Sequence, residues 1–290
     1  MDLNRVLDIV FGGIMLGGIY GLVSLGLNLQ YGVARVLNVA HGEFTTLGAF
    51  LTWWLYVAAG MSPFVGLVTS LLLSFGLGWI LYRLIFARLQ RHVRSLEAFE
   101  AACMLTSFGI LFAIQNLIIL TWGADVRSYS YLPGAVRLGE LVLPVNRILI
   151  FGVSVGLGGL FYALLKWTRT GKAIRAAAQD RSGAASVGVD VQNVLGICFA
   201  LGTGAAGAAG SLISITYSIH PVMGFEYTVI AIIVVVLGGL GNIPGSLLGG
   251  ILLGVVGTAV TYWQPGLAVV AYYLFFVVLL WWRPRGLLAA

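Results

Sequence analysis

Three polar side chains that could take part in proton or metal chemistry stand close together in an apolar chain. Asn38, His41 and Glu43 lie in QYGVARVLNVAHGEF, residues 30–44. Metal-binding pairs on a helix are usually three or four residues apart, so that both ligands share a face. His41 and Glu43 are only two apart, which does not fit a metal site. A proton relay within a membrane is one interpretation. The favoured one is a helix start, with Asn38 or His41 as the cap and Glu43 near the helix dipole. All three remain candidates for lining a transport path.

A second group of residues interrupts an apolar stretch near the C-terminal end. GGLGNIPGSLLGG, residues 238–250, places a proline among its glycines and indicates a real helix break. Broken backbone in a membrane is tolerated only beside protein or a water-filled cavity, and such segments in both halves of a chain are typical of transport sites. The glycines of residues 202–211 favour close helix packing instead. The path candidates within the break are Gly238, Gly239, Gly241 and Asn242.

The longest amphipathic, water-soluble segment is TRTGKAIRAAAQDRSGAASVGVDV, residues 168–191, between two apolar stretches. Residues 173–178 favour a helix, and glycines punctuate the segment. Its excess of basic residues is equally compatible with a topology signal or a solvated face. A regular alanine-rich helix closed by Gly188 favours a docking surface for a cytoplasmic partner.

Composition places the whole chain in a membrane. Of 290 residues, 60% are hydrophobic and only 9% are charged, and the mean hydropathy is +1.00. A soluble domain carries about a quarter charged residues, so this chain cannot cover a water-facing surface. Its net charge of +6 reflects basic residues beside the spans and is no sign of nucleic-acid binding. Cys103 and Cys198 fall inside apolar runs and give neither a disulfide framework nor a metal site.

The apolar pattern predicts an all-α, polytopic integral membrane protein with eight or nine membrane-crossing helices. Two segments, residues 44–59 and 226–240, are shorter than the roughly 20 residues that a straight span needs. We expect one transmembrane domain, residues 1–290. Basic clusters within 83–94, 166–181 and 283–285 predict the cytoplasmic side. The N-terminus is then outside and the C-terminus is cytoplasmic. The N-terminal apolar run is too long for a cleavable signal and is expected to stay as the first span.

Sequence motifs of enzymes are absent. The chain has no Walker A sequence, no H-E-x-x-H and no G-x-S-x-G. Acidic residues within apolar stretches are nearly absent too, with Glu43 and Glu226 the nearest candidates. Carriers that are coupled to an ion gradient usually keep such acids in mid-span. The sequence therefore argues against an enzyme and against a charge-coupled carrier.

Four stretches, in order, resemble the branched-chain amino acid ABC transporter permeases of the LivH type. They are GLNLQYGVARVLNVAHGEF (26–44), the basic segment 168–191, VLGGLGNIPGSLLGGILLG (236–254) and RPRGL (283–287). The resemblance covers nearly the whole chain but does not specify a solute. It implies one permease subunit of an ATP-driven importer in the bacterial plasma (inner) membrane. Leucine-like amino acids, other amino acids, amides and urea are the solutes that the family carries.

The resemblance also implies partners and a coupling site. The partners are a second homologous permease, two cytoplasmic ATPase subunits and an extracytoplasmic solute-binding protein. ATP and magnesium belong to the ATPases, so no cofactor is expected in this chain. The basic segment matches the family's coupling helix, in which Arg175 and Asp180 would make or orient contacts and residues 176–178 would pack closely. The matching motif positions are Gly171, Lys172, Arg175, Asp180 and Gly188. An ion-coupled carrier or a passive channel for a small neutral solute is the alternative.

Overall fold

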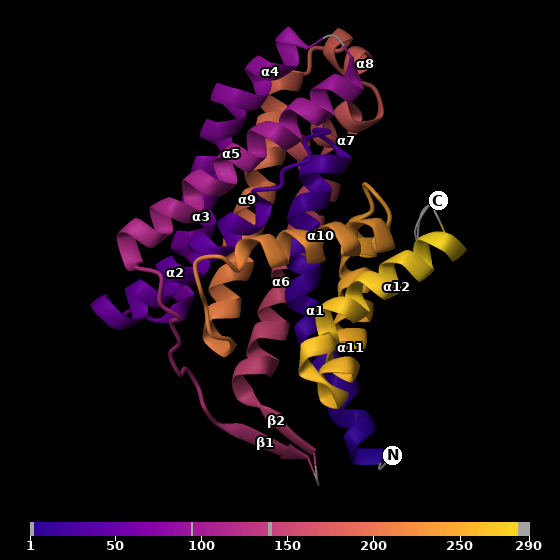
Figure 1. The fold of residues 1–290 in the computed structure, drawn as a ribbon. Helices are drawn as coiled ribbons and strands as arrows, with labels where there is room; N and C mark the ends of the chain where they lie inside the picture. Colours follow the sequence, from indigo (N-terminus) through magenta and orange to yellow (C-terminus); the bar gives the residue numbers. More distant parts are fainter. Residues whose placement is uncertain (1–2, 94, 139–140, 284–290) are drawn as a thin grey trace.

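The computed structural model describes residues 3–93, 95–138 and 141–283, and nearly all of them are helical (Figure 1). Arg94 and Arg285, two of the arginines in the predicted cytoplasmic clusters, lie outside the described residues. The first half contains α1 (Leu3–Gly32), α2 (His41–Ala59), α3 (Pro63–Leu81), a π-helix (Tyr82–Phe86), α4 (Ala87–His92) and α5 (Leu96–Trp122). The second contains α6 (Val145–Trp167), α7 (Arg169–Gln179), α8 (Arg181–Ser186), α9 (Val191–Thr216), α10 (Gly224–Gly238), α11 (Ile243–Trp263) and α12 (Ala268–Trp282).

Seven helices in the described part are long and apolar enough to cross a membrane, and α10 is a shorter apolar helix. At about 1.5 Å per residue, the 15 residues of α10 reach only about 22 Å, short of a hydrocarbon core of roughly 30 Å. Figure 1 shows α10 lying across α1 instead of alongside it. The polytopic all-α prediction is confirmed, and the observed number of segments is close to the predicted eight or nine.

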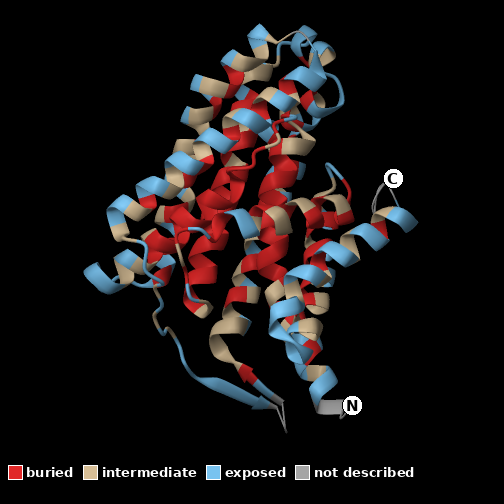
Figure 2. Cartoon of the chain, viewed as in Figure 1, coloured by how far each residue is buried: buried red, intermediate tan, exposed pale blue. Residues whose placement is uncertain are grey.

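Helix α9 forms the centre of the bundle. In its most apolar stretch 89% of the residues are buried, against 11% for the span that contains α12, and Figure 2 shows buried residues gathered around α9, α1 and α2. Its glycines permit this burial because the backbone of a neighbour takes the place of a side chain: Gly202 lies against Gly26, Gly207 against Gly48, and Gly210 against the Thr45 carbonyl. The packing interpretation of residues 202–211 is confirmed.

The two ends of the bundle differ. One end carries α7 and α8. The other, which we call the hairpin end, carries the start of α1 and an antiparallel hairpin of β1 (Ala135–Leu138) and β2 (Leu141–Pro144), as Figure 1 shows. The connection between α5 and α6 therefore has a strand pair of its own.

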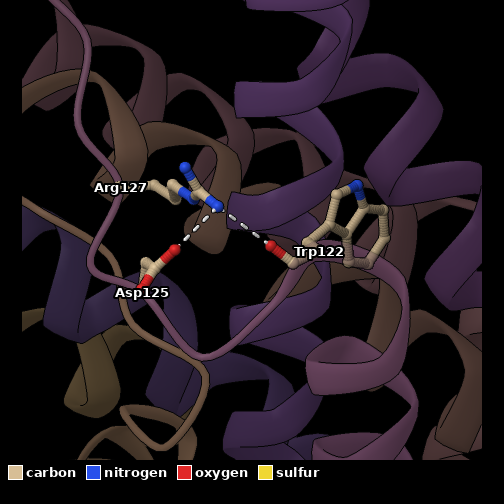
Figure 3. A network of polar contacts seen from close by, with 3 residues as sticks. All are labelled: Trp122, Asp125 and Arg127. Atoms are coloured by element: carbon tan, nitrogen blue, oxygen red, sulfur yellow. Dashed lines mark hydrogen bonds and ion pairs between the residues drawn. The ribbon is translucent and has the colours of Figure 1, made fainter.

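A small polar cluster orders the chain that leads to the hairpin (Figure 3). The Arg127 guanidinium donates to the Trp122 carbonyl at 3.2 Å, where α5 ends, and to the Asp125 carboxylate at 3.2 Å. It also lies 5.1 Å from the ring centre of Trp53 on α2. The Arg127 backbone pairs with Ile219, which follows α9. One residue thus joins three elements at the hairpin end.

Candidate functional site

Helix α7 presents a basic outer face at one end of the bundle. Its buried residues, Gly171, Ile174 and Ala177, recur every three positions and face the bundle, while Lys172 and Ala178 are exposed. The Thr168 hydroxyl caps the helix by accepting from the Gly171 amide at 3.0 Å. Of the predicted packing face 176–178, the middle residue is already buried within this chain, so only its exposed neighbour is free for a partner.

Arg175 has a structural task as well as an exposed charge. Its guanidinium donates to the Leu165 carbonyl and, at 3.3 Å, to the Lys166 carbonyl. Both carbonyls lie in the last turn of α6. The last carbonyls of a helix have no backbone amide of that helix to pair with, and the helix dipole favours a cation there. Arg175 therefore fixes the angle between α6 and α7.

The predicted single helix, closed by Gly188, is wrong in one respect: it is broken at Asp180. Asp180 has extended backbone (φ −148°, ψ 109°) and its carboxylate accepts from the Ser182 amide at 2.9 Å, which ends α7 and caps α8. A side-chain hydrogen bond from Ser182, followed by backbone amides, lowers the pKa of Asp180. Gly188 closes α8 and has a φ of +86°. The segment is thus two short helices with a fixed bend.

Arg181 fastens α8 to the end of α1. Its guanidinium donates to the Val33 carbonyl at 3.2 Å and to the Ala34 carbonyl at 3.1 Å. Burial lowers the pKa of this arginine. Sequence analysis did not single it out, although it immediately follows Asp180. Two hydrogen bonds thus tie the bend of the segment to the end of α1.

The glycine break between α10 and α11 is real, and a residue of α1 holds it. Gly239 and Gly241 have φ values of +89° and +81°, which side chains rarely adopt. The Asn28 amide donates to Ser246 Oγ at 2.7 Å and to the Asn242 carbonyl at 3.1 Å. Its carbonyl oxygen accepts from the Gly241 amide at 2.6 Å. Asn28 stands in LNLQ, residues 27–30. The residues that it contacts lie more than 200 positions further along the chain, so the local sequence gives no sign of the contacts.

The start of α2 agrees with the prediction, but the cap does not. Asn38 accepts from the Ala40 amide at 3.1 Å, just before the helix, whereas the His41 ring caps nothing. Gln30 Oε1 lies 3.2 Å from His41 Nδ1 and accepts from the Asn38 amide at 3.1 Å. The Val23 carbonyl lies 2.9 Å from His41 Nε2. The histidine cap is wrong because α1 offers both ring nitrogens a buried partner.

Glu43 points elsewhere. Its carboxylate lies against Gly224 at the start of α10, where an added Cβ would meet Glu43 Cδ at 2.6 Å. Within the described residues neither of its oxygens has a hydrogen-bond partner, and the side chain is fully buried. His41 instead lies against Gly26. The structure therefore does not bring His41 and Glu43 together as one site, which agrees with the spacing argument against a metal pair.

The path candidates fall into two layers. Asn38, His41, Glu43, Gly238 and Gly239 are buried inside the bundle, whereas Gly241 is exposed and Asn242 is half-buried. The coupling candidates lie on or beside α7 and α8, where Gly171 is buried and the other four are exposed. The polytopic helical bundle defines the chain as an integral membrane protein.

Comparison with known proteins identifies the family. The family described as the branched-chain amino acid transport system / permease component matches residues 9–281, and the chain belongs to it. The high-affinity branched-chain amino acid transport system permease protein LivH of Escherichia coli (strain K12) is 30% identical over 267 residues, which cover 85% of this chain and 83% of LivH. LivH of Salmonella typhimurium is 29% identical over the same shares. BraD of Pseudomonas aeruginosa, named for the same system, is 27% identical over 99% of this chain and 97% of BraD. No solved structure matches.

Proposed function

We propose that this chain is a permease subunit of an ATP-driven ABC importer for branched-chain or related amino acids, with amides and urea as further members of the solute class. The whole chain, 1–290, forms one transmembrane domain. Its partners are a second homologous permease, two cytoplasmic ATPase subunits and an extracytoplasmic solute-binding protein. The chain itself is no enzyme: the ATPases bind ATP and magnesium, and they drive alternating access of the permease pair.

One observation carries the proposal. The surface of α7 and α8 projects Lys172 and Ala178 outward, while Arg175 and Arg181 bind it to the ends of α6 and α1. A topology signal requires only basic charge and would not require two capped helices fixed to two spans. A rigid, exposed and basic surface is suited to receiving force from a partner.

The same surface orients the chain. If α7 and α8 face the cytoplasm, the hairpin end and the N-terminus are outside and Arg283 is inside, as the positive-inside rule requires. The protein then lies in the plasma membrane of a bacterium as a multi-pass subunit. The solute-binding protein would dock at the hairpin end.

The test blocks the docking surface without disturbing the fold. Ala178→Trp adds bulk on the exposed side of α7, and we expect ATP-driven uptake to fall at least tenfold while co-purification of the ATPases is lost. Ala101→Trp, on an exposed residue of α5 outside both proposed docking surfaces, is the matched control and keeps uptake. Normal uptake and normal ATPase recovery in the Ala178 variant would overturn the docking assignment.

Recovery of partners separates the proposal from its alternatives. A gentle detergent pull-down from native membranes is expected to yield two ATPase subunits and a second permease together with this chain. A chain recovered alone and monodisperse, with uptake that follows an ion gradient, would mean a secondary carrier. Conduction without nucleotide would mean a passive channel.

A further inference from the structure

A cavity at the hairpin end of the bundle lies away from both candidate regions described above. It encloses about 510 Å³ between the first half of α1, the starts of α6, α10 and α12, and the end of α11. Small-molecule sites commonly span about 300–1,000 Å³. The cavity is therefore large enough for an amino acid.

Two opposite charges line this cavity, Arg147 near the start of α6 and Glu226 in the first turn of α10. Within the described part of the chain, neither side chain forms a hydrogen bond or an ion pair with another residue. Charged groups among spans usually pair or face a water-filled cavity and mark the path of a solute. A cation and an anion that line one cavity can bind the two ends of a zwitterion.

Arg147 and Thr258 both lie close to Gly12 of α1. A Cβ added at Gly12 would lie 4.0 Å from Arg147 Nη1 and 3.5 Å from Thr258 Cγ2, in ordinary contact with both side chains. A second, small cavity shares Leu16, Arg147 and Tyr217 with the first and reaches Thr216. The Thr216 hydroxyl is buried without a hydrogen-bond partner among the described residues. Unpartnered buried polar atoms are rare and indicate that water or a ligand completes the site.

Tyrosines form most of the remaining polar wall. Six of the chain's 12 tyrosines line the cavity: Tyr20, Tyr217, Tyr227, Tyr262, Tyr272 and Tyr273. The hydroxyls of Tyr20 and Tyr272 lie 3.1 Å apart and join α1 to α12. Aromatic faces attract an ammonium group, and phenol hydroxyls donate to a carboxylate. Leu16, Val229, Ile230 and Ile233 add an apolar surface for an aliphatic side chain.

We propose that this cavity binds the zwitterion of an aliphatic amino acid, with Arg147 on the carboxylate and Glu226 on the ammonium group. The inference rests on the proposed function and assigns its solute a binding site within this chain. The solute would occupy it after release from the extracytoplasmic partner and before it reaches the break between α10 and α11. A zwitterionic lipid headgroup has the same pair of charges and is the competing occupant.

A thiol-protection experiment tests the site directly. Thr258→Cys is introduced into the complete transporter in nanodiscs, and its modification by a water-soluble methanethiosulfonate is timed with and without L-leucine. The two native cysteines are buried. We expect L-leucine to slow the reaction at least fivefold. 3-Methylbutylamine and 4-methylpentanoate, which each lack one charge, should not. Ser128→Cys, on an exposed residue outside the cavity, is the control that leucine leaves unchanged.

Charge variants then assign the two ends of the ligand. Arg147→Gln and Glu226→Gln should each abolish the protection and slow ATP-driven leucine uptake about tenfold or more, the scale of one charge-assisted contact. Arg147→Lys should restore part of the protection. Arg88→Gln, an exposed arginine of α4 that lies outside the cavity and outside both proposed docking surfaces, is the matched control with normal uptake.

The outcomes distinguish the two proposals. A wild-type transporter without ATP-driven leucine uptake overturns the proposed function. Wild-type uptake with no leucine protection, or with protection that survives both glutamine variants, overturns the site alone. Modification that follows the phosphatidylethanolamine content and ignores leucine assigns the cavity to a lipid and likewise overturns it. Because protection is read in the Thr258→Cys chain itself, poor assembly of a charge variant does not leave the question open.

Discussion

We expect Asn28→Ala to lower the free energy of unfolding by removing the contacts that hold the break between α10 and α11. The effect should exceed that of removing any other side-chain amide. Asn28 is almost fully buried and makes three well-formed hydrogen bonds, at 2.6, 2.7 and 3.1 Å. Interhelical bonds in membranes contribute about 0.6 kcal/mol each, and typical protein hydrogen bonds up to about 1.5 kcal/mol. Three bonds therefore give a loss of about 2 to 4.5 kcal/mol in the free energy of unfolding.

The assay is reversible unfolding of the purified chain in mixed micelles, followed by the fluorescence of its 8 tryptophans. Asn116→Ala is the matched control. Asn116 is an exposed asparagine on α5 whose amide makes one bond, at 2.8 Å, to the Phe112 carbonyl of its own helix. Its loss should cost less than about 0.5 kcal/mol, as for most surface substitutions.

A double-mutant cycle shows whether the energy belongs to the break. Asn28→Ala and Ser246→Ala share the 2.7 Å bond, so their effects should be non-additive by about 0.5–1.5 kcal/mol. Additive effects, or an Asn28 variant as stable as the Asn116 variant, would refute the view that α1 holds the break in place.

Three further predictions concern packing, capping and the bend. Gly210→Leu should lower the free energy of unfolding by at least about 2 kcal/mol, because the new side chain would meet the α2 backbone at Thr45. Gly159→Leu is the control: an added Cβ there meets nothing within 4 Å, so the same unfolding assay should show little change. The pKa of Asp180 is lowered below 3.8, so its stabilisation of α8 is complete above that pH and is lost as the pH falls through the lowered value. The protection factors of the α8 amides, corrected for the intrinsic pH dependence of exchange, should therefore fall in acid, whereas Asp180→Asn, which still caps, should remove this pH dependence. Arg181→Leu should free α8 from α1 and halve ATP-driven uptake or worse without reducing membrane insertion; unchanged uptake would contradict the role of this contact.

Local patterns predicted the elements well where one physical cause dominated. Hydropathy gave the spans because a bilayer requires about 20 apolar residues whatever the neighbours are. The small residues 202–211 indicated close packing because only glycine and alanine let backbones touch. Pro244 and Asn242 among the glycines of residues 238–250 indicated a helix break, and left-handed backbone at Gly239 and Gly241 forms it.

The polar contacts could not be predicted in the same way, because each joins residues that are distant in sequence. Nothing in the local pattern around His41 shows that Gln30 Oε1 and the Val23 carbonyl lie within hydrogen-bond distance of its ring. The neighbouring residues therefore predicted a helix cap, whereas in the structure His41 is a buried core residue. Arg147 and Glu226 were separated by about 80 residues and had no motif in common, so only the fold brings them to one cavity.

The C-terminal turns of α1 join the two regions that the sequence singled out separately. Asn28 holds the glycine break, Gln30 holds the start of α2 and the Phe199 carbonyl of α9, and the carbonyls of Val33 and Ala34 receive Arg181. If a partner docks on α8 as proposed, a displacement of α8 would be passed first to the end of α1. It would then reach the break through the Asn28 amide and not through a loop. Coupling between sites needs such a contiguous element with two arrangements, and a helix break held by one side chain is an element that a small shift can release. On this geometry, α1 would transmit a displacement from the proposed docking surface to the proposed transport path.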